Sequence, residues 1–195
     1  MSKKAKIIGL SIFAVIMIFV CKYVYDMNIN HNFETITEGK VYKSAVIPPD
    51  EIASYVKKYH IKSIVDLRMP GTNDLVLNPE SPGELQAERA AVANIGGVNY
   101  FSNPSEQVPN EQNIAVFTKI MDNKDNYPIL IHCYHGTGRA EMYAALYRIE
   151  YENFTNEAAR QGVRTLIKFS SFDDGTPKGE YLKGYKSRKQ LSNKQ

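Results

Sequence analysis

The chain is poor in cysteine, in histidine and in excess charge, and each shortage excludes a class of protein. Its two cysteines, Cys21 and Cys133, lie far apart, so we expect no internal disulfide. Four histidines, none with a second ligand at metal-binding spacing, argue against a metal site, and we expect no cofactor. A net charge of +3 is too small to indicate a nucleic-acid partner.

No internal repeat or low-complexity tract is visible in the 195 residues, a length that suits one anchored domain better than two. With 43% hydrophobic and 23% charged residues, the chain can form a packed core. Much of the positive charge lies near the two ends. We interpret the basic segment 176–195 as a solvated, frayed tail; contact with anionic lipid is the alternative.

An apolar run covers residues 7–25 and contains one charge, Lys22. Nineteen residues suit one membrane-spanning helix. A cleaved signal peptide begins in the same way, but no small-x-small cleavage site follows Val20, so we favour an uncleaved signal anchor. Lysines before the run place residues 1–6 in the cytoplasm and the rest of the chain in the periplasm or outside the cell.

Beyond a polar linker at residues 26–34, strand-like and helix-like segments alternate over residues 35–175. The expected strands are 40–45, 61–67, 97–101 and 129–131. The expected helices are 49–59, 84–94, one capped by Asn110, one that carries Met142, Ala145, Leu146 and Ile149, and 156–167; residues 69–83 are an expected loop. This alternation predicts an α/β domain with a central, mainly parallel sheet flanked by helices.

The segment with the clearest chemistry starts where the last expected strand ends at Cys133. Five residues, two of them glycines, then turn the chain, and Arg139 opens a helix. A glycine-bearing turn lets backbone N–H groups form an anion-binding nest, and the helix N-terminus adds positive potential. Arginine donates two parallel hydrogen bonds to two phosphate oxygens. The same field stabilises a thiolate, so one loop provides both a nucleophile and a phosphate site.

The pattern His132-Cys133-x-x-Gly136-x-x-Arg139 resembles the signature of cysteine-based protein tyrosine phosphatases. The compact size is similar to that of the dual-specificity branch, especially its small bacterial members. Segments 32–45 and 61–68 look like the opening strands of that family. The resemblance implies a metal-free mechanism, in which Cys133 attacks phosphorus to give a phosphocysteine that water hydrolyses. It also implies that Arg139 binds the substrate together with His132, Tyr134, His135, Gly136, Thr137 and Gly138.

Two positions depart from the family pattern. The family has Ser or Thr after the arginine, where a hydroxyl helps the sulfur to leave; here Ala140 stands there, so breakdown of the phosphoenzyme is expected to be slow. The family's acid is an aspartate on a preceding loop, but residues 101–110 contain no Asp. Glu106 is the candidate acid in that loop, with Asp66 and Asp74 as alternatives on other segments.

The expected substrate is a phosphorylated protein, an inositol phosphate or a phospholipid. His132 is expected to orient the loop and tune the thiol, as in the family. His135 favours multiply phosphorylated substrates if it lines the pocket as a cation, and is otherwise a surface histidine. Two other hypotheses for the function remain open. A phosphate-binding pseudophosphatase would explain Ala140 and the missing Asp, and a rhodanese-type sulfurtransferase also places a cysteine in an anion-binding loop.

Overall fold

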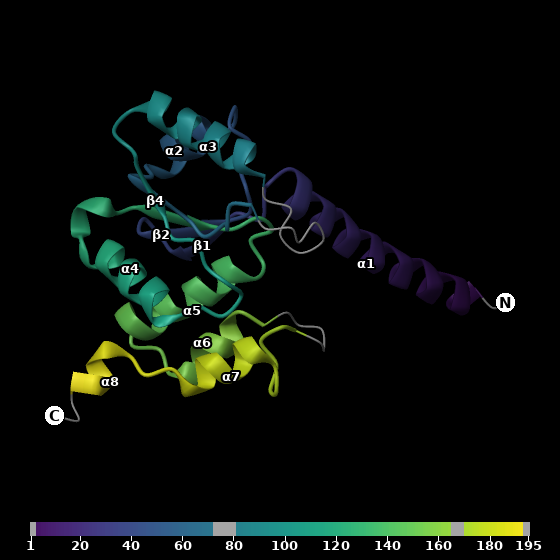
Figure 1. The fold of residues 1–195 in the computed structure, drawn as a ribbon. Coiled ribbons are helices and arrows are strands. Elements are labelled where there is room, and N and C mark those ends of the chain that lie inside the picture. Colours follow the sequence, from purple (N-terminus) through teal and green to yellow (C-terminus); the bar gives the residue numbers. More distant parts are fainter. Residues whose placement is uncertain (1–2, 72–80, 165–169, 193–195) are drawn as a thin grey trace.

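The computed structural model of the protein describes residues 3–71, 81–164 and 170–192. Figure 1 shows a layered domain from which one long helix, α1, projects. In chain order the elements are α1 Lys3–Asn28, β1 Glu34–Thr37, β2 Val41–Ser44, α2 Ile52–Tyr59, β3 Ser63–Asp66, α3 Pro82–Ile95, β4 Asn99–Ser102, α4 Glu111–Asp122, the short 3₁₀ helix η1 Lys124–Asn126, β5 Ile129–His132, α5 Arg139–Tyr151, α6 Asn156–Gly162, α7 Pro177–Gly184 and α8 Arg188–Ser192.

Five strands form one sheet in the order β1-β2-β5-β3-β4. Strands β2, β5, β3 and β4 run parallel, and β1 pairs antiparallel with β2 at one edge. The predicted α/β class with a mainly parallel sheet is therefore confirmed, and the four expected strands correspond to β2, β3, β4 and β5. The hydrophobic pattern does not indicate β1, because its four residues are exposed or half-buried at the sheet edge.

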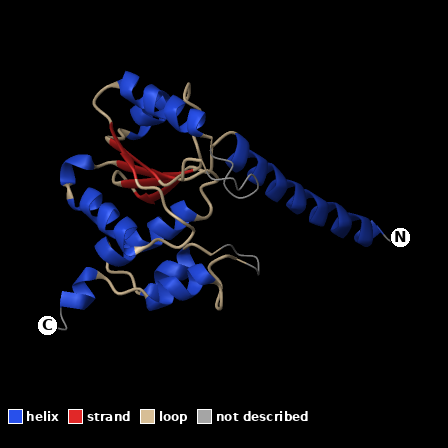
Figure 2. Ribbon diagram, in the orientation of Figure 1, coloured by secondary structure: helices blue, strands red, loops and turns tan. Residues whose placement is uncertain are grey.

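Helices cover both faces of the sheet (Figures 1 and 2), with α2 and α3 on one face and α4 and α5 on the other. Successive residues of a buried strand point to opposite faces. In β5, Leu130 packs with residues of α2 and α3, whereas Ile129 and Ile131 pack with residues of α4 and α5. Each face thus has its own hydrophobic core. This arrangement holds β5, the strand that leads to Cys133, rigidly between two packed layers.

Local signals explain most helix boundaries. The side chain of Asn110 accepts a hydrogen bond from the N–H of Asn113 and caps α4, as predicted. Ser81 caps α3 with Pro82 at the first turn, so that helix begins two residues earlier than expected. The last expected helix is shorter than predicted, since α6 ends at Gly162. Residues 165–169, and 72–80 of the expected loop, lie outside the described residues.

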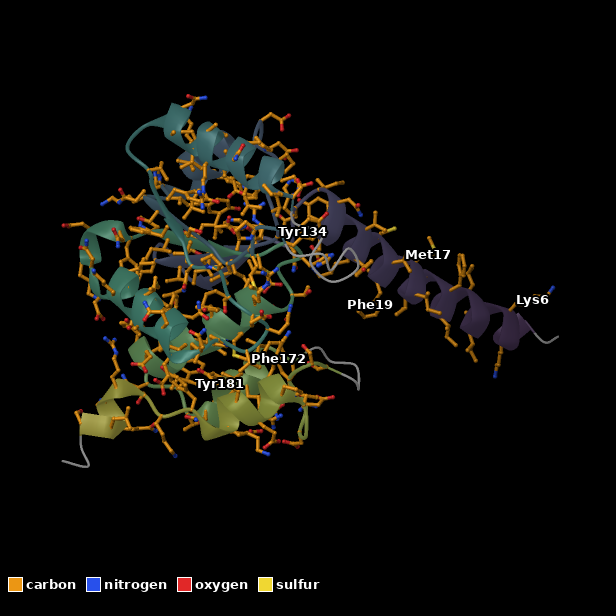
Figure 3. The ribbon with its side chains drawn as sticks, viewed as in Figure 1. Lys6, Met17, Phe19, Tyr134, Phe172 and Tyr181 are labelled. Carbon is orange, nitrogen blue, oxygen red and sulfur yellow. The ribbon has the colours of Figure 1, made fainter. Side chains whose placement is uncertain are left out.

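Helix α1 contains the apolar run. Its segment Lys6–Asp26 has 21 residues, a mean hydropathy of 2.5 and no part buried against the rest of the protein. Met17 and Phe19 are exposed on the part of this helix that projects beyond the domain (Figure 3). This length and hydropathy suffice to cross a bilayer, and a signal sequence has the same properties. The helix itself is confirmed, while its insertion in a membrane stays a prediction.

Residues 26–34, the expected linker, pack against the domain over part of their length. Asp26 still belongs to α1, and its carbonyl accepts a hydrogen bond from the N–H of Asn32 at 2.6 Å. His31, Asn32 and Phe33 are buried, and the Phe33 ring stacks on Tyr59 with centroids 4.3 Å apart. The side chains of His31 and Asn32 form hydrogen bonds with Glu51 and with the His135 carbonyl, so this segment connects α1 to the domain through specific contacts.

The basic segment 176–195 is also not a frayed tail over the part that the structure describes. Helix α7 packs on α5 and α6, with Lys178 and Leu182 buried. Arg188, the first residue of α8, forms ion pairs with Asp122 at 2.7 Å and Glu150 at 3.2 Å. The prediction relied on the high lysine content of the segment and missed the apolar face of α7, which packs on the domain.

Candidate active site

Cys133 follows β5 directly, at the edge of the sheet where the parallel strands end. His132 of β5 pairs in register with Ser44 of β2 and with Asp66 of β3, so the three strands end at one level. Open α/β sheets bind their ligands outside the carboxyl ends of the strands. Cys133 is 3% exposed and lies at this edge. Of the two cysteines, Cys21 lies in α1, and the topology places Cys133 where a ligand is expected.

The carbonyl groups of three successive loop residues are each held from outside the loop. The hydrogen bonds run from the Val46 N–H to the Tyr134 carbonyl (3.1 Å), from Asn32 Nδ2 to the His135 carbonyl (3.2 Å) and from Lys43 Nζ to the Gly136 carbonyl (3.3 Å). In a trans peptide the next N–H points opposite to the carbonyl. The N–H groups of the following residues, His135, Gly136 and Thr137, therefore point to the inside of the loop. The Gly136 N–H accordingly donates to Cys133 Sγ at 3.3 Å.

Gly136 is required by the close approach of the neighbouring chain. Its φ is +73°, a conformation that other residues rarely adopt. A Cβ at this position would lie 2.6 Å from the Ala45 nitrogen and 2.8 Å from the Ser44 carbonyl carbon. These contacts are with backbone atoms, which cannot move aside without displacing β2. The loop can close against β2 only with glycine at this position.

Arg139 opens α5 and is 2% exposed. Its Nη1 donates a hydrogen bond to the Leu67 carbonyl at 2.8 Å, which anchors the guanidinium to the segment after β3. The N-terminus of α5 adds positive potential next to the same loop. The following residue, Ala140, is fully buried and supplies no hydroxyl to the site.

A pocket of about 340 Å³ opens over the loop, at the small end of the range for ligand sites. Its described lining consists of Gln107, Cys133, His135, Thr137, Gly138, Arg139, Ser171 and Lys178. Five predicted site residues are thus brought together, His135 among them. Tyr134 instead lines a neighbouring cavity of about 530 Å³, which Asn28 at the end of α1 also lines. Figure 3 labels Tyr134 beside this end of α1.

The candidate acid Glu106 is exposed and is not among the described lining residues. Its neighbour Gln107 lines the pocket instead, and the side-chain oxygen of Gln107 approaches Gly138 so closely that a Cβ there would lie 2.9 Å away. An amide can position a substrate or a water molecule, but it does not exchange a proton near neutral pH. The alternative Asp74 lies outside the described residues.

Asp66 is buried behind the loop in a network of charged groups. Its carboxylate accepts hydrogen bonds from Arg68 Nε and Nη2, both at 2.9 Å, and from the Tyr100 hydroxyl at 2.5 Å. Burial alone would raise its pKa, but His132 and Arg68 outweigh burial and hold the pKa at about 2. An Asp66 that remains ionised at neutral pH has no proton to donate, so its pairing with Arg68 is structural.

His132 lies in the same network. Its Nε2 is 2.9 Å from Glu88 Oε1 and 3.8 Å from Asp66 Oδ1. Burial acts to lower the pKa of His132, but the Glu88 and Asp66 carboxylates outweigh it and raise the pKa above its ordinary value. The imidazole lies behind the loop against these two carboxylates and is not among the described residues that line the pocket, a placement that suits the expected orienting role better than contact with substrate.

Asp66, Glu88 and His132 also bring three possible metal-ligand atoms within 4.8 Å of one another. The sequence did not indicate this cluster, because its members come from β3, α3 and β5. Arg68 Nη2 contacts both carboxylates and supplies the positive charge that a metal ion would bring. We therefore interpret the cluster as a buried ion network rather than a metal site.

Lys178 is one of three described lining residues that sequence reasoning missed, together with Gln107 and Ser171. It enters the pocket from α7, and its Nζ is 3.5 Å from Ser171 Oγ. Burial lowers its pKa, partly opposed by Cys133 nearby. No local signal distinguishes Lys178 from the other lysines of the basic segment, because only the packing of α7 turns it inward.

A parallel sheet with a Cys-x₅-Arg loop at its carboxyl edge is the architecture of dual-specificity phosphatases. Residues 21–176 match the family model described as DSP-PTPase phosphatase fused to NAD⁺ kinase, and the chain belongs to this family. The resemblance noted in the sequence is thereby confirmed. No curated protein sequence matches the chain.

Solved structures show the same fold. The core catalytic domain of the PP-IP phosphatase SIW14 from S. cerevisiae, in complex with citrate, superposes with a TM-score of 0.57 at 17% identity over 80% of this chain and 86% of that one. TpbA from P. aeruginosa gives 0.57 at 19% identity over the same shares, 80% and 86%. A Cys-to-Ser variant of TpbA in complex with pTyr gives 0.51 at 16% identity, over 79% and 89%. At these identities the likeness establishes the fold alone.

Proposed function

We propose that this protein is a phosphomonoester hydrolase that works through a phosphocysteine on Cys133, with protein phosphotyrosine as the first substrate class. The observation that supports it best is the loop itself. Three outward-held carbonyls leave three N–H groups pointing at the space beside a buried thiol, and Arg139 borders the same pocket. Such a nest fits the oxygens of a phosphate.

In the first step the Cys133 thiolate attacks phosphorus, an S–P bond forms and the P–O bond to the leaving group breaks. The nest and the Arg139 guanidinium bind the phosphate oxygens and stabilise their charge as the reaction proceeds. In the second step water attacks the phosphorus of the phosphocysteine, and inorganic phosphate and Cys133 are released.

The leaving group determines the preferred substrate. No carboxylic acid lines the pocket among the residues that the structure describes. A phenol, with a pKa of about 10, leaves with less help from an acid than an aliphatic alcohol does. Phosphotyrosine is therefore favoured over phosphoserine and phosphothreonine in our proposal.

A second candidate is an inositol-phosphate or phospholipid phosphatase with the same chemistry. The short path from α1 to the loop favours it, because Asn32, four residues after the end of α1, donates directly to the His135 carbonyl. An apolar helix so close to the pocket suits a substrate at a membrane surface. A pseudophosphatase with weak activity is the remaining alternative, favoured by Ala140.

Cys133→Ser tests the proposal, with Cys21→Ser as the matched control because Cys21 is the other cysteine and lies in α1. We expect Cys133→Ser to abolish hydrolysis of an aryl phosphate while still binding vanadate, and Cys21→Ser to retain activity.

Arg139→Lys should lose most activity, since lysine cannot donate the paired hydrogen bonds. Activity should persist in EDTA. Full turnover by Cys133→Ser would overturn the proposal, and a wild type that binds vanadate without turnover on phosphotyrosine, phosphoserine or phosphoinositide substrates would identify a pseudophosphatase.

We also propose that α1 is an uncleaved anchor, with residues 1–6 in the cytoplasm and the phosphatase domain in the periplasm or outside the cell. The support is the lysine asymmetry around the apolar run. A reporter that is active only outside the cytoplasm, fused after Gln195, should be active. The reverse pattern would place the domain in the cytoplasm, and a mature protein beginning near residue 26 would indicate cleavage.

A further inference from the structure

Among the described residues, two lysines are buried, Lys43 and Lys178, and they differ in their partners. Lys43 Nζ lies 2.9 Å from Glu141 and 3.2 Å from Glu34, so its charge is neutralised. Lys178 is 8% exposed, and its recorded contacts are the Ser171 hydroxyl at 3.5 Å and the face of the Phe172 ring at 5.2 Å. Within residues 3–71, 81–164 and 170–192, no carboxylate forms an ion pair with Lys178. A buried ammonium without a carboxylate partner is costly, so an anion in the pocket, in addition to Cys133, would stabilise it.

The ammonium of Lys178 lies directly at the phosphate loop. A Cβ on Gly138 would be 3.1 Å from Lys178 Nζ, and Lys178 shares the pocket with Cys133 and Arg139. Its helix α7 is fixed against α5 and α6, so the side chain is held in place by packing rather than reaching in from a mobile terminus. The structure thus aims a second cation at the space above the loop.

The pocket has more hydrogen-bond donors than one phosphate can use. A bound phosphate monoester has three free oxygens, and the inward N–H groups with the Arg139 guanidinium suffice to bind them. The Gln107 amide, the Ser171 hydroxyl and the Lys178 ammonium remain, all lining the same pocket. Donors left over beside a phosphate nest, among them a cation that pairs with no described carboxylate, indicate a place for a second anionic group.

We propose that Lys178, with Ser171, binds a second phosphate of the substrate next to the one held at Cys133. The site then prefers substrates with two phosphates close together, such as a diphosphate or a vicinal bisphosphate, and this favours the inositol-phosphate or phospholipid class, our second candidate, over protein phosphotyrosine. This inference rests on the proposed phosphate site at Cys133 and assigns a specificity-determining residue to it.

Calorimetric binding of inorganic phosphate and inorganic pyrophosphate to the full chain tests the inference without turnover. We expect wild type to bind pyrophosphate at least about tenfold more tightly than phosphate, and Lys178→Met to lose that preference. Lys183→Met is the matched control, because Lys183 is on the same helix and pairs outward with Asp174 and Glu180. It removes the same charge and should keep the preference, which separates local binding from net charge.

The outcomes separate this inference from the proposed function. If Lys178→Met keeps the preference, or weakens both anions equally, Lys178 does not bind a second phosphate. If wild type binds neither anion, the proposed phosphate site fails as well. A thermal unfolding scan without ligand gives a second readout: removing an unpaired buried charge should leave the unfolding temperature unchanged or raise it, whereas a marked decrease would show that Lys178 is structural and overturn the inference.

Discussion

Behind the Cys133 loop, charged side chains neutralise one another, whereas in front of it the buried Lys178 forms no ion pair with a carboxylate of the described residues. At the back, Asp66 and Glu88 are in contact with Arg68 and His132. At the front, the described pocket lining contains Arg139 and Lys178 and no carboxylate. Lys178 is buried like the groups at the back, although His135, Thr137 and Ser171 at the rim of the pocket are exposed, so the burial of Lys178 alone does not distinguish the two regions.

The difference shows how one short loop can have a fixed conformation on one side and bind a ligand on the other. Buried charges that are paired within the protein contribute to a unique arrangement of the strands and the loop. A buried cation that faces a pocket is instead available to a ligand. Variants that remove charge from the back should therefore affect folding, and variants at the front should affect binding and turnover.

The largest effect is expected at the back, from Arg68→Met. This change leaves Asp66 and Glu88 buried close together without their shared cation, which costs about 3–5 kcal/mol of unfolding free energy. Chemical denaturation measures it. Arg89→Met on the exposed surface of α3 is the control and should cost far less. A loss below about 1 kcal/mol in Arg68→Met would show that the network is not a structural unit.

At the front, Ala140→Ser should accelerate the breakdown of the phosphocysteine. A hydroxyl next to Arg139 can donate to the departing sulfur, a bond to a charged group worth about 1.5–3 kcal/mol, or roughly ten- to a hundredfold in rate. Wild type should show a burst of aryl product followed by slow turnover, and the variant a smaller burst with faster steady state. Ala145→Ser, equally buried in α5 but six residues from Arg139, is the control. Equal steady-state rates in all three proteins would mean that breakdown is not limiting.

Asn32→Ala tests the outer supports of the nest. Losing the hydrogen bond to the His135 carbonyl should cost about 0.5–1.5 kcal/mol, up to roughly tenfold in kcat/KM, because the peptide is freer to rotate its N–H away from the phosphate. Asn30→Ala is the matched control, since its amide donates to the Phe33 carbonyl and not to the loop. Similar losses in both variants would indicate a general effect of the 29–33 segment.

The smallest effect is expected from Glu106→Gln. The side chain is exposed and outside the described pocket lining, so alkyl and aryl phosphate hydrolysis should each change by less than about twofold. Gln107→Ala in the pocket should be more damaging. A selective loss of alkyl phosphate hydrolysis in Glu106→Gln would instead identify Glu106 as the acid and add a carboxylate to the front region.

Sequence could predict the parts of the site that are contiguous in the chain. Residues 129–139 contain, in order, a buried strand, Cys133, a glycine-bearing turn and Arg139. After Arg139 the apolar residues recur with the spacing of a helix. The supports of the loop come from far away. Asn32 lies 103 residues before His135, and Lys43 lies 93 residues before Gly136. A polar side chain carries no local signal of which distant carbonyl it will meet, so these contacts need the fold.

The packing of α7 determines where the folded phosphatase domain ends. Leu182 is fully buried, and Lys178 borders the pocket, yet both lie beyond residue 176, the last residue of the family match. A protein trimmed to the matched region would expose the apolar surface under α7 and open one wall of the pocket. Truncations, fusions and comparisons with relatives should therefore keep the chain to at least Ser192, the end of α8.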